Sequence, residues 1–134
     1  MRAHVAIIIK DSDKILFIKR SMKKKTLPGA YSFPSGTIEE GESAFETTIR
    51  EGNEELGIVL EPEKIISEKE LPELDTKLIF VLCKMRQGKI IIDFNEIQEI
   101  EWMTFQDFFN RFSDNEIGHG LVWLRKNPEI WKNI

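Results

Sequence analysis

Short apolar blocks separated by polar turns dominate the first part of the chain. Residues 5–9 are apolar and largely β-branched, the polar run 10–13 follows, and residues 15–18 resume the apolar pattern. This pattern predicts two strands joined as a hairpin. The polar and basic segment 21–30 ends in Pro-Gly, which predicts a loop. Other extended or strand-like segments are expected at residues 31–34, 64–71, 77–85, 89–93 and 100–103.

Capping signals predict where the helices begin and end. Ser43 and Glu46 have the spacing of a capping box, and Gly57 lies where a helix would stop in a left-handed conformation. These signals predict a helix over residues 44–56. Later helices are expected over residues 104–112 and 119–126. Strands interleaved with helices predict a mixed sheet covered by helices, which is an α/β fold.

The helix predicted over residues 44–56 has two distinct faces. At about 100° per residue, Glu55 lies roughly 40° to one side of Glu51 and Glu54 roughly 60° to the other side. Three carboxylates therefore share one arc of the helix, together with Thr47. A separate apolar stripe is formed by Phe45, Ile49, Gly52 and Leu56.

This acidic face is unfavourable for an isolated helix. Like charges three or four residues apart repel by roughly a few tenths of a kcal/mol per pair. Glu54 and Glu55 also lie in the last turn, where the helix dipole disfavours anions. A divalent cation would reverse both penalties, since Mg²⁺ prefers carboxylate oxygens, and it would also attract phosphate. The alternative, which a lone Glu-x-x-Glu-Glu sequence would favour, is a simply solvated acidic face.

Composition places the chain among ordinary globular proteins. With 134 residues, of which 41% are hydrophobic and 31% charged, it is expected to form one domain over residues 1–134. The formal charge of −4 and the short lysine run 23–25 argue against a nucleic-acid partner. The only cysteine, Cys83, lies in an apolar run and is expected to be buried. Because no bilayer-spanning segment or signal-peptide pattern is found, a cytoplasmic location is expected.

The segment from Gly36 to Ile58 resembles the signature of the Nudix hydrolases. That signature reads Gly, five residues, Glu, seven residues, Arg-Glu, an apolar residue, any residue, Glu-Glu, any residue, Gly and an apolar residue. The matching residues are Gly36, Glu42, Arg50, Glu51, Glu54, Glu55, Gly57 and Ile58. Gly52 departs from the signature, because an aliphatic side chain is usual there, and Ser35 replaces a common glycine.

The resemblance implies both a fold and an activity. The fold is an α/β/α sandwich built on a mixed β-sheet. The activity is Mg²⁺-dependent hydrolysis of a diphosphate linkage in a nucleoside di- or triphosphate derivative, with Mn²⁺ as an alternative ion. By resemblance, Glu51 and Glu55 are the main metal ligands, and Glu54 is a further ligand or positions the attacking water. The Gly36 carbonyl is an additional ligand candidate.

Further roles follow from the same resemblance. Arg50 would orient the glutamates, and Glu42 would pair with the signature from its loop. Glu96 is preferred as a distal carboxylate, either as a metal ligand or as the general base, with Glu99 in reserve. Members of the family differ in which glutamate acts as the base. The candidates for that role are Glu54, Glu55 and Glu96.

Substrate contacts are expected outside the signature. Arg20, at the end of the second predicted strand, is a candidate for holding the outer phosphates, whereas the lysines 23–25 are better explained as solvated loop charges. Tyr31 and Phe33 are the aromatic candidates for substrate binding. For Tyr31, as for Phe80, packing in the core is the favoured alternative. The expected partner is a small nucleotide diphosphate, without a membrane, and a homodimer is compatible with the family.

Two other classes of function stay open. One is a binding or regulatory module of the same fold that senses a nucleotide without hydrolysing it, although an intact set of three glutamates argues against it. The other is an isopentenyl diphosphate isomerase, which would need a cysteine near its active site, whereas Cys83 lies in an apolar strand. The substrate is not specified, because the loops at about 21–30, 72–76 and 104–119 would select it.

Overall fold

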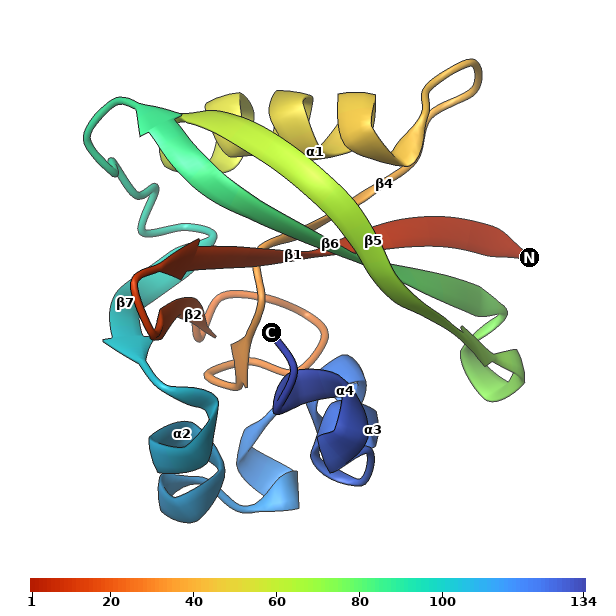
Figure 1. The fold of residues 1–134 in the computed structure, drawn as a ribbon, viewed down its shortest axis with the longest axis vertical. Helices are drawn as coiled ribbons and strands as arrows, with labels where there is room; N and C mark the ends of the chain where they lie inside the picture. Colours follow the sequence, from red (N-terminus) through yellow and green to blue (C-terminus); the bar gives the residue numbers. More distant parts are fainter. The chain divides into compact units, whose positions relative to one another are not determined.

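The computed structural model describes residues 1–134, which form two compact units (Figure 1). The first unit contains residues 1–10 and 34–91, and the second unit contains residues 11–33 and 92–134. Each unit combines β-strands with helical segments. The single domain expected over the whole chain stays a prediction.

A mixed sheet is the frame of the first unit. Its strands are β1 (Arg2–Asp11), β4 (Ser35–Thr37), β5 (Val59–Leu71) and β6 (Thr76–Gln87). β1 is parallel to β6, whereas β4 is antiparallel to β1 and β5 is antiparallel to β6. Cys83, on β6, is fully buried as predicted, and burial raises the pKa of its thiol to about 12. Fully buried apolar side chains on the two parallel strands include Val5, Ile7, Ile8, Ile9, Phe80 and Val81.

β5 is longer than its sequence pattern predicted. It begins at Val59 rather than at residue 64, although Pro62 lacks a backbone N–H and interrupts the apolar pattern. β5 lies at the end of its sheet and pairs with β6 alone, and the register shifts between Pro62 and Lys64. A proline is tolerated at such a position, because an edge strand with a bulge does not need every donor.

The strand predicted over residues 89–93 is wrong, because this segment forms no strand. The chain turns after β6 at Gly88, whose φ of +110° is rarely adopted by residues with side chains. It then reaches the end of the preceding helix, where the Ile91 N–H donates to the Leu56 carbonyl at 2.9 Å. A short apolar block is compatible with either arrangement, so periodicity alone could not distinguish them.

The helix predicted over residues 44–56 forms in two parts. α1 spans Ala44–Glu51, and Gly52–Leu56 continue it as a π-helical turn. The predicted capping box is present: the Ser43 hydroxyl accepts from the Glu46 N–H at 3.1 Å, and the Glu46 carboxylate accepts from the Ser43 N–H at 2.9 Å. The predicted limits are therefore confirmed, while the α-helical spacing assumed for the last turn is wrong.

Two glycines shape the end of this helix. Gly57 ends it with a φ of 68°, the left-handed conformation that the sequence predicted. Gly52 lies against β5, where a β-carbon on the glycine would be 2.7 Å from Leu60 Cδ1 and 2.8 Å from Leu60 Cγ. An aliphatic side chain from the neighbouring strand therefore fills the space that a side chain at Gly52 would need.

We expect Gly52→Val to destabilise the chain. Valine improves helix propensity over glycine by roughly 0.5 kcal/mol, but overpacking against Leu60 costs about 1–3 kcal/mol. Urea unfolding measures the net loss of the free energy of unfolding. In a Leu60→Ala background the same substitution should cost less than half as much, and equal costs in the two backgrounds would refute this packing explanation.

The second unit has an antiparallel sheet. Its strands are β2 (Lys14–Arg20), β3 (Tyr31–Ser32) and β7 (Ile97–Met103), and both β3 and β7 pair with β2. Its helical segments are α2 (Phe105–Arg111), a 3₁₀ turn (Asp114–Glu116), α3 (His119–Arg125) and α4 (Pro128–Trp131). The prediction placed α2 and α3 correctly and missed α4. The prediction used Pro128 only as the residue before which the preceding helix stops. In the structure Pro128 is the first residue of α4, a position at which proline is well tolerated.

An aromatic cluster packs the helices of the second unit onto its sheet. Phe17 on β2 stacks on Phe108 of α2 with ring centroids 3.8 Å apart, and on Phe33 with centroids 5.7 Å apart. The ring centroids of Tyr31 and Phe112 are 4.2 Å apart. Offset and edge-to-face contacts of this kind stabilise a core beyond simple burial.

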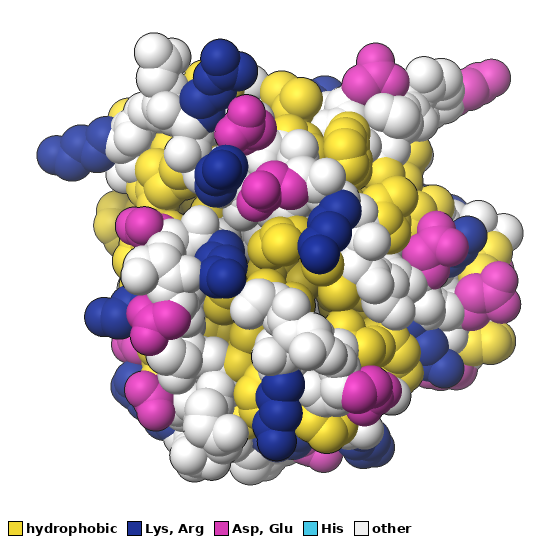
Figure 2. Space-filling model, in the orientation of Figure 1, with side chains coloured by type: hydrophobic (Ala, Val, Ile, Leu, Met, Phe, Trp, Pro, Cys, Tyr) yellow, Lys and Arg dark blue, Asp and Glu magenta, His cyan; other side chains and the backbone are white.

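Charges of both signs are interspersed on the molecular face drawn in Figure 2, with hydrophobic side chains between them. The formal net charge of −4 is therefore not gathered into one acidic patch on that face. None of the helices has both the length and the apolar character that a bilayer crossing requires.

Candidate functional site

The glycine loop and the helix of the signature meet inside the first unit. β4 holds Gly36 by pairing with β1, where Gly36 is opposite Val5. The Glu51 side chain of α1 lies directly against Gly36, since a β-carbon on this glycine would be 2.2 Å from Glu51 Cδ and 2.4 Å from Oε1. Any side chain at position 36 would therefore displace the Glu51 carboxylate.

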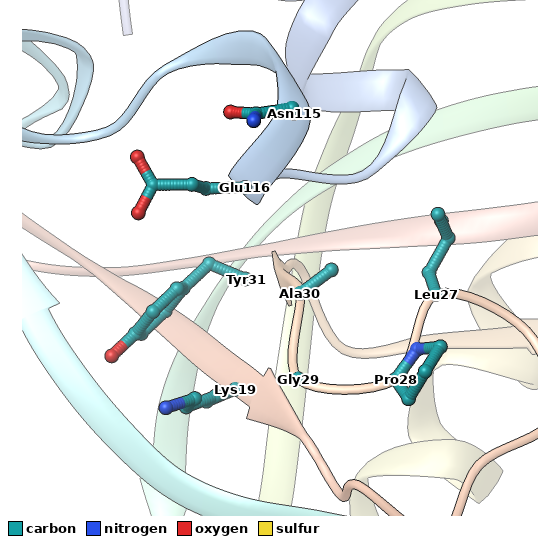
Figure 3. Close-up of a pocket in the computed structure, with 8 residues that line it drawn as sticks. All are labelled: Lys19, Leu27, Pro28, Gly29, Ala30, Tyr31, Asn115 and Glu116. Atoms are coloured by element: carbon teal, nitrogen blue, oxygen red, sulfur yellow. The ribbon is translucent and has the colours of Figure 1, made fainter.

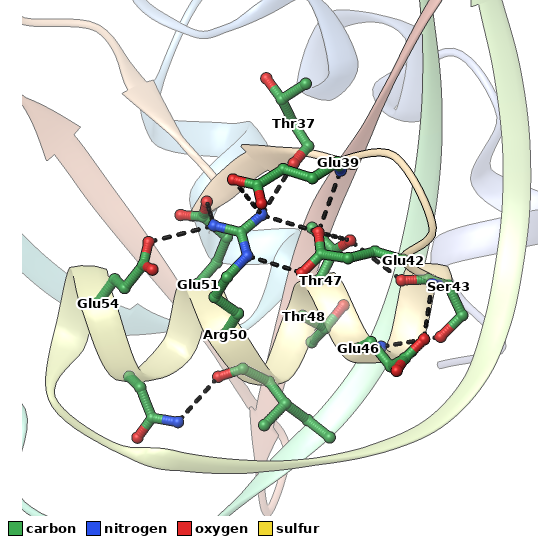
Figure 4. Close-up of polar contacts among 12 residues, drawn as sticks. Thr37, Glu39, Glu42, Ser43, Glu46, Thr47, Thr48, Arg50, Glu51 and Glu54 are labelled. Atoms are coloured by element: carbon green, nitrogen blue, oxygen red, sulfur yellow. Dashed lines mark hydrogen bonds and ion pairs between the residues drawn. The ribbon is translucent and has the colours of Figure 1, made fainter.

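Arg50 connects the carboxylates around this contact (Figure 4). Its Nε donates to Glu42 Oε2 at 2.8 Å, and its Nη2 donates to Glu42 Oε1 at 3.0 Å, which is a bidentate pair. Nη1 donates to Glu51 Oε1 at 2.9 Å and to Glu54 Oε2 at 3.1 Å. Nη2 also donates to the Thr37 carbonyl at 3.0 Å. One guanidinium thus joins α1, the π turn and the loop after β4.

The pKa values of the two carboxylates nearest to Arg50, those of Glu42 and Glu51, are shifted in opposite directions. The pKa of Glu42 is lowered to about 2, mainly by the Arg50 hydrogen bonds and then by the Glu39 N–H. The pKa of Glu51 is raised, because its burial outweighs the stabilising bonds from Arg50 and because Glu54 and Glu39 add like charge. A raised pKa means that the negative charge of Glu51 is incompletely compensated, so a cation at its free oxygen would be stabilised.

The convergence of three carboxylates expected from the helical wheel is not preformed. No group of three or more histidine, cysteine, aspartate or glutamate side chains is arranged to hold a metal ion. A π turn has roughly 4.4 residues per turn instead of 3.6, so Glu54 is rotated further from Glu51 than the wheel assumed. Glu54 is 60% exposed and bound to Arg50, while Glu55 is half-buried one turn beyond Glu51.

The donor set nevertheless suits a hard divalent cation. Glu51, Glu54 and Glu55 offer carboxylate oxygens from consecutive turns, and Gly36, whose backbone lies against the Glu51 side chain, has a carbonyl oxygen. Oxygen ligands of this type are the ones that Mg²⁺ prefers. Arg50 already bridges Glu51 and Glu54 through one nitrogen, so a cation has to bind at the carboxylate oxygens that Arg50 leaves available.

The two distal carboxylate candidates lie in the second unit, where both have partners. Glu96 accepts from the Lys24 ammonium at 2.5 Å, and its carbonyl accepts from the Ser21 N–H at 3.0 Å. Glu99 accepts from the Tyr31 hydroxyl at 2.5 Å. The role expected for either carboxylate stays a prediction. Lys24 thus forms an ion pair with Glu96, whereas the sequence analysis favoured solvated loop charges for the lysines at 23–25.

The substrate-binding candidates are also in the second unit. Arg20 stabilises the loop after β2 through two hydrogen bonds to Thr26. Its Nε donates to the Thr26 carbonyl and its Nη2 donates to the Thr26 hydroxyl, both at 3.0 Å. Tyr31 and Phe33 are 7% and 4% exposed and belong to the aromatic cluster, which is the packing alternative favoured for Tyr31. Contacts of these three residues with a substrate stay predictions.

A pocket of about 420 Å³ opens beside Tyr31 within the second unit (Figure 3). Its volume lies in the range of small-molecule sites. Lys19 lies over the Tyr31 ring, with Nζ 5.8 Å from the ring centroid. The pocket is lined by Lys19, Leu27, Pro28, Gly29, Ala30, Tyr31, Asn115 and Glu116. Neither Asn115 nor Glu116 was a candidate by itself, although the 3₁₀ turn that contains them lies in the segment 104–119 that was expected to help select the substrate.

Two polar partners of the first unit were also missed by sequence reasoning. The Thr37 carbonyl accepts from Arg50, and the Thr47 hydroxyl lies 2.9 Å from Glu42 Oε1. Thr47 does fall on the acidic arc of the helical wheel, which was the one available signal. Every residue has a backbone carbonyl, so the sequence could not show that the carbonyl of Thr37 is a partner of Arg50.

Comparisons with known proteins agree with the fold and with the signature. The chain matches the family model of the NUDIX domain over residues 1–122. It is similar to Nudix hydrolase 8 of Arabidopsis thaliana, with 27% identity over 105 residues, 75% of this chain and 28% of that protein. It is also similar to the NAD-capped RNA hydrolase NUDT12 of Macaca fascicularis, with 26% identity over 121 residues, 81% of this chain and 26% of that protein. The chain thus spans little more than a quarter of the length of these curated relatives.

A solved structure extends the likeness over nearly the whole chain. The MutT protein from Methanosarcina mazei Go1 superposes with a TM-score of 0.75 at 21% identity, covering 98% of this chain and 93% of that chain. This likeness confirms the predicted fold class, a mixed sheet with helices in the Nudix fold. Because the family model matches most of the chain and the signature residues meet around Gly36 and Arg50, the chain belongs to the NUDIX domain family.

Proposed function

We propose that the chain hydrolyses a diphosphate linkage in a nucleoside di- or triphosphate derivative and that it does so with Mg²⁺. The observation that carries this proposal is the contact of the Glu51 carboxylate with Gly36, beside an arginine that also holds Glu42 and Glu54. This arrangement places an incompletely compensated carboxylate against the Gly36 backbone, which suits a cation and, through it, a phosphate.

The residues of the first unit are proposed to have two roles, metal binding and positioning of the metal-binding carboxylates. Glu51, Glu55 and the Gly36 carbonyl would hold the ion, with Glu54 as a further ligand, whereas the ligand role of Glu96, which belongs to the second unit, stays a prediction. A bound Mg²⁺ supplies neutralisation of the charge that develops on the phosphate oxygens. Arg50 keeps Glu51 and Glu42 in fixed positions, so that little reorganisation is needed when the substrate binds.

A glutamate would also orient and deprotonate the water that attacks phosphorus. General-base action requires a carboxylate within hydrogen-bond reach of that water. Glu54 has a 60% exposed carboxylate beside Arg50, and Glu55 and Glu96 are the other candidates. Release of Glu54 from Arg50 would make it available for this task, since an ion pair whose carboxylate is 60% exposed contributes little to stability.

Substrate recognition is proposed to use residues of the second unit. Arg20 presents a guanidinium at the end of β2, and Tyr31 forms a rigid wall of the 420 Å³ pocket. The relatives support a nucleotide derivative as the substrate class, since one is named as a hydrolase of NAD-capped RNA. The expected cytoplasmic location, the homodimer and the absence of a nucleic-acid partner stay predictions.

A substrate panel with and without Mg²⁺ tests the proposal. The panel contains oxidised and ordinary nucleoside triphosphates, dinucleoside polyphosphates, nucleotide sugars and a dinucleotide with a diphosphate bridge. We expect at least one compound to release a phosphate-containing product only when Mg²⁺ or Mn²⁺ is present. Saturable binding of these compounds without release under any metal condition would instead support a regulatory module and refute the hydrolase.

A further inference from the structure

Two neighbouring threonines of α1 are fully buried and have different hydrogen-bond partners (Figure 4). The Thr48 hydroxyl donates only to the Ala44 carbonyl, one turn earlier on the same helix, at 2.9 Å. The Thr47 hydroxyl lies 3.0 Å from the corresponding Ser43 carbonyl but also 2.9 Å from Glu42 Oε1, which belongs to the loop before the helix. Only Thr47 therefore links the helix interior to the carboxylates around Arg50.

The single hydroxyl hydrogen of Thr47 is expected to go to Glu42. A hydroxyl donates one hydrogen bond, and a bond to an ionised carboxylate is stronger than one to a neutral carbonyl. The Ser43 carbonyl also already accepts the Thr47 backbone N–H at 3.0 Å. Glu42 is ionised at neutral pH, since its pKa is lowered to about 2 by Arg50 and the Glu39 N–H.

Glu42 transmits this contact to the rest of the site. Its Oε1 accepts from Thr47, from the Glu39 N–H at 3.0 Å and from Arg50 Nη2 at 3.0 Å, while Oε2 accepts from Arg50 Nε at 2.8 Å. The orientation of the Glu42 carboxylate therefore sets the plane of the guanidinium. Through Nη1 the same guanidinium holds Glu51 Oε1.

We propose that Thr47 is a positioning residue of the site, whose buried hydroxyl fixes Glu42 and, through Glu42 and Arg50, the Glu51 carboxylate. The family signature leaves this position unspecified, so the inference comes from the contacts of this chain. It rests on the proposed function wherever catalysis is the readout.

Thr48 provides a matched control for a test of this inference. Thr47→Val and Thr48→Val each remove one buried hydroxyl from adjacent positions of the same helix, and Thr47→Ser restores the hydroxyl. Two quantities are compared: hydrogen exchange at Arg50 Nε–H by NMR, which needs no catalysis, and the kcat and KM of Mg²⁺-dependent hydrolysis for the best substrate of the panel.

We expect Thr47→Val to speed exchange at Arg50 Nε–H and to lower kcat, each by about fivefold to tenfold, as the loss of one hydrogen bond predicts. KM should stay within about twofold of the wild type, because Thr47 acts on the site and not on the bound nucleotide. Thr48→Val and Thr47→Ser should match the wild type in both readouts.

Equal behaviour of Thr47→Val and Thr48→Val in exchange and in kcat would overturn the inference. Failure of Thr47→Ser to restore the wild-type exchange rate would do the same, because the hydroxyl would then not be the cause. If the wild type hydrolyses nothing, the proposed function fails, and the exchange measurement alone still decides whether Thr47 positions Arg50.

Discussion

Glu55→Gln is expected to lower the kcat of Mg²⁺-dependent diphosphate hydrolysis by at least about a hundredfold, the size of effect seen when a group that stabilises developing charge is removed. Glutamine keeps the size and shape of Glu55 but removes the charge that we propose holds a hard cation. The apparent Mg²⁺ concentration for half-maximal activity should rise as well.

The same substitution is expected to leave the fold intact or to stabilise it slightly. Glu55 lies at the end of a helical turn, where the dipole disfavours anions, and it is one turn beyond Glu51. Loss of activity together with an unchanged or higher urea midpoint would therefore identify a carboxylate kept for function. Glu40→Gln, on the exposed loop before α1, is the control for loss of one negative charge and should behave like the wild type. Wild-type turnover in Glu55→Gln would reject the ligand assignment.

Arg50→Lys is expected to reduce kcat/KM by at least about thirtyfold while retaining the positive charge. Arg50 makes a bidentate pair with Glu42 and further bonds to Glu51, Glu54 and the Thr37 carbonyl. A lysine ammonium has only three donors and no planar fork, so it cannot hold the loop and both helix carboxylates at once.

The matched control for Arg50→Lys is Arg86→Lys on β6, where the arginine side chain is exposed. Activity and the urea midpoint should both be unchanged in that variant. In Arg50→Lys the urea midpoint should fall, and added salt should not restore activity, because the lost feature is geometry and not net charge. Activity equal to that of Arg86→Lys would show that the Arg50 network is not needed for the reaction.

The sequence predicted those parts of the site that depend on interactions between residues close together in the chain. The capping box of Ser43 and Glu46 and the left-handed Gly57 fixed the limits of the helix, since both act within one turn. The spacing of the signature brought Gly36, Glu51 and Arg50 into one segment. Their contact could then be anticipated from the family resemblance, because β4 and α1 are separated only by a short loop.

Features that depend on long-range packing were not predictable in this way. The π turn follows no periodicity rule, and the space at Gly52 is filled by Leu60 from β5, a residue whose position depends on the whole sheet. The apolar block before Asp93 reads equally well as a strand, and only the contact of Ile91 with Leu56 decides its conformation. The Thr47–Glu42 bond likewise requires the loop geometry.

The central claim, that the acidic helix face binds a divalent cation beside Gly36, is tested most directly by adding substoichiometric Mn²⁺ while recording amide NMR signals. The account predicts selective broadening of the Gly36, Glu51 and Glu55 signals, reversal by excess Mg²⁺, and loss of the effect in Glu51→Gln. Uniform or absent broadening of these signals, or unchanged broadening in Glu51→Gln, would contradict it.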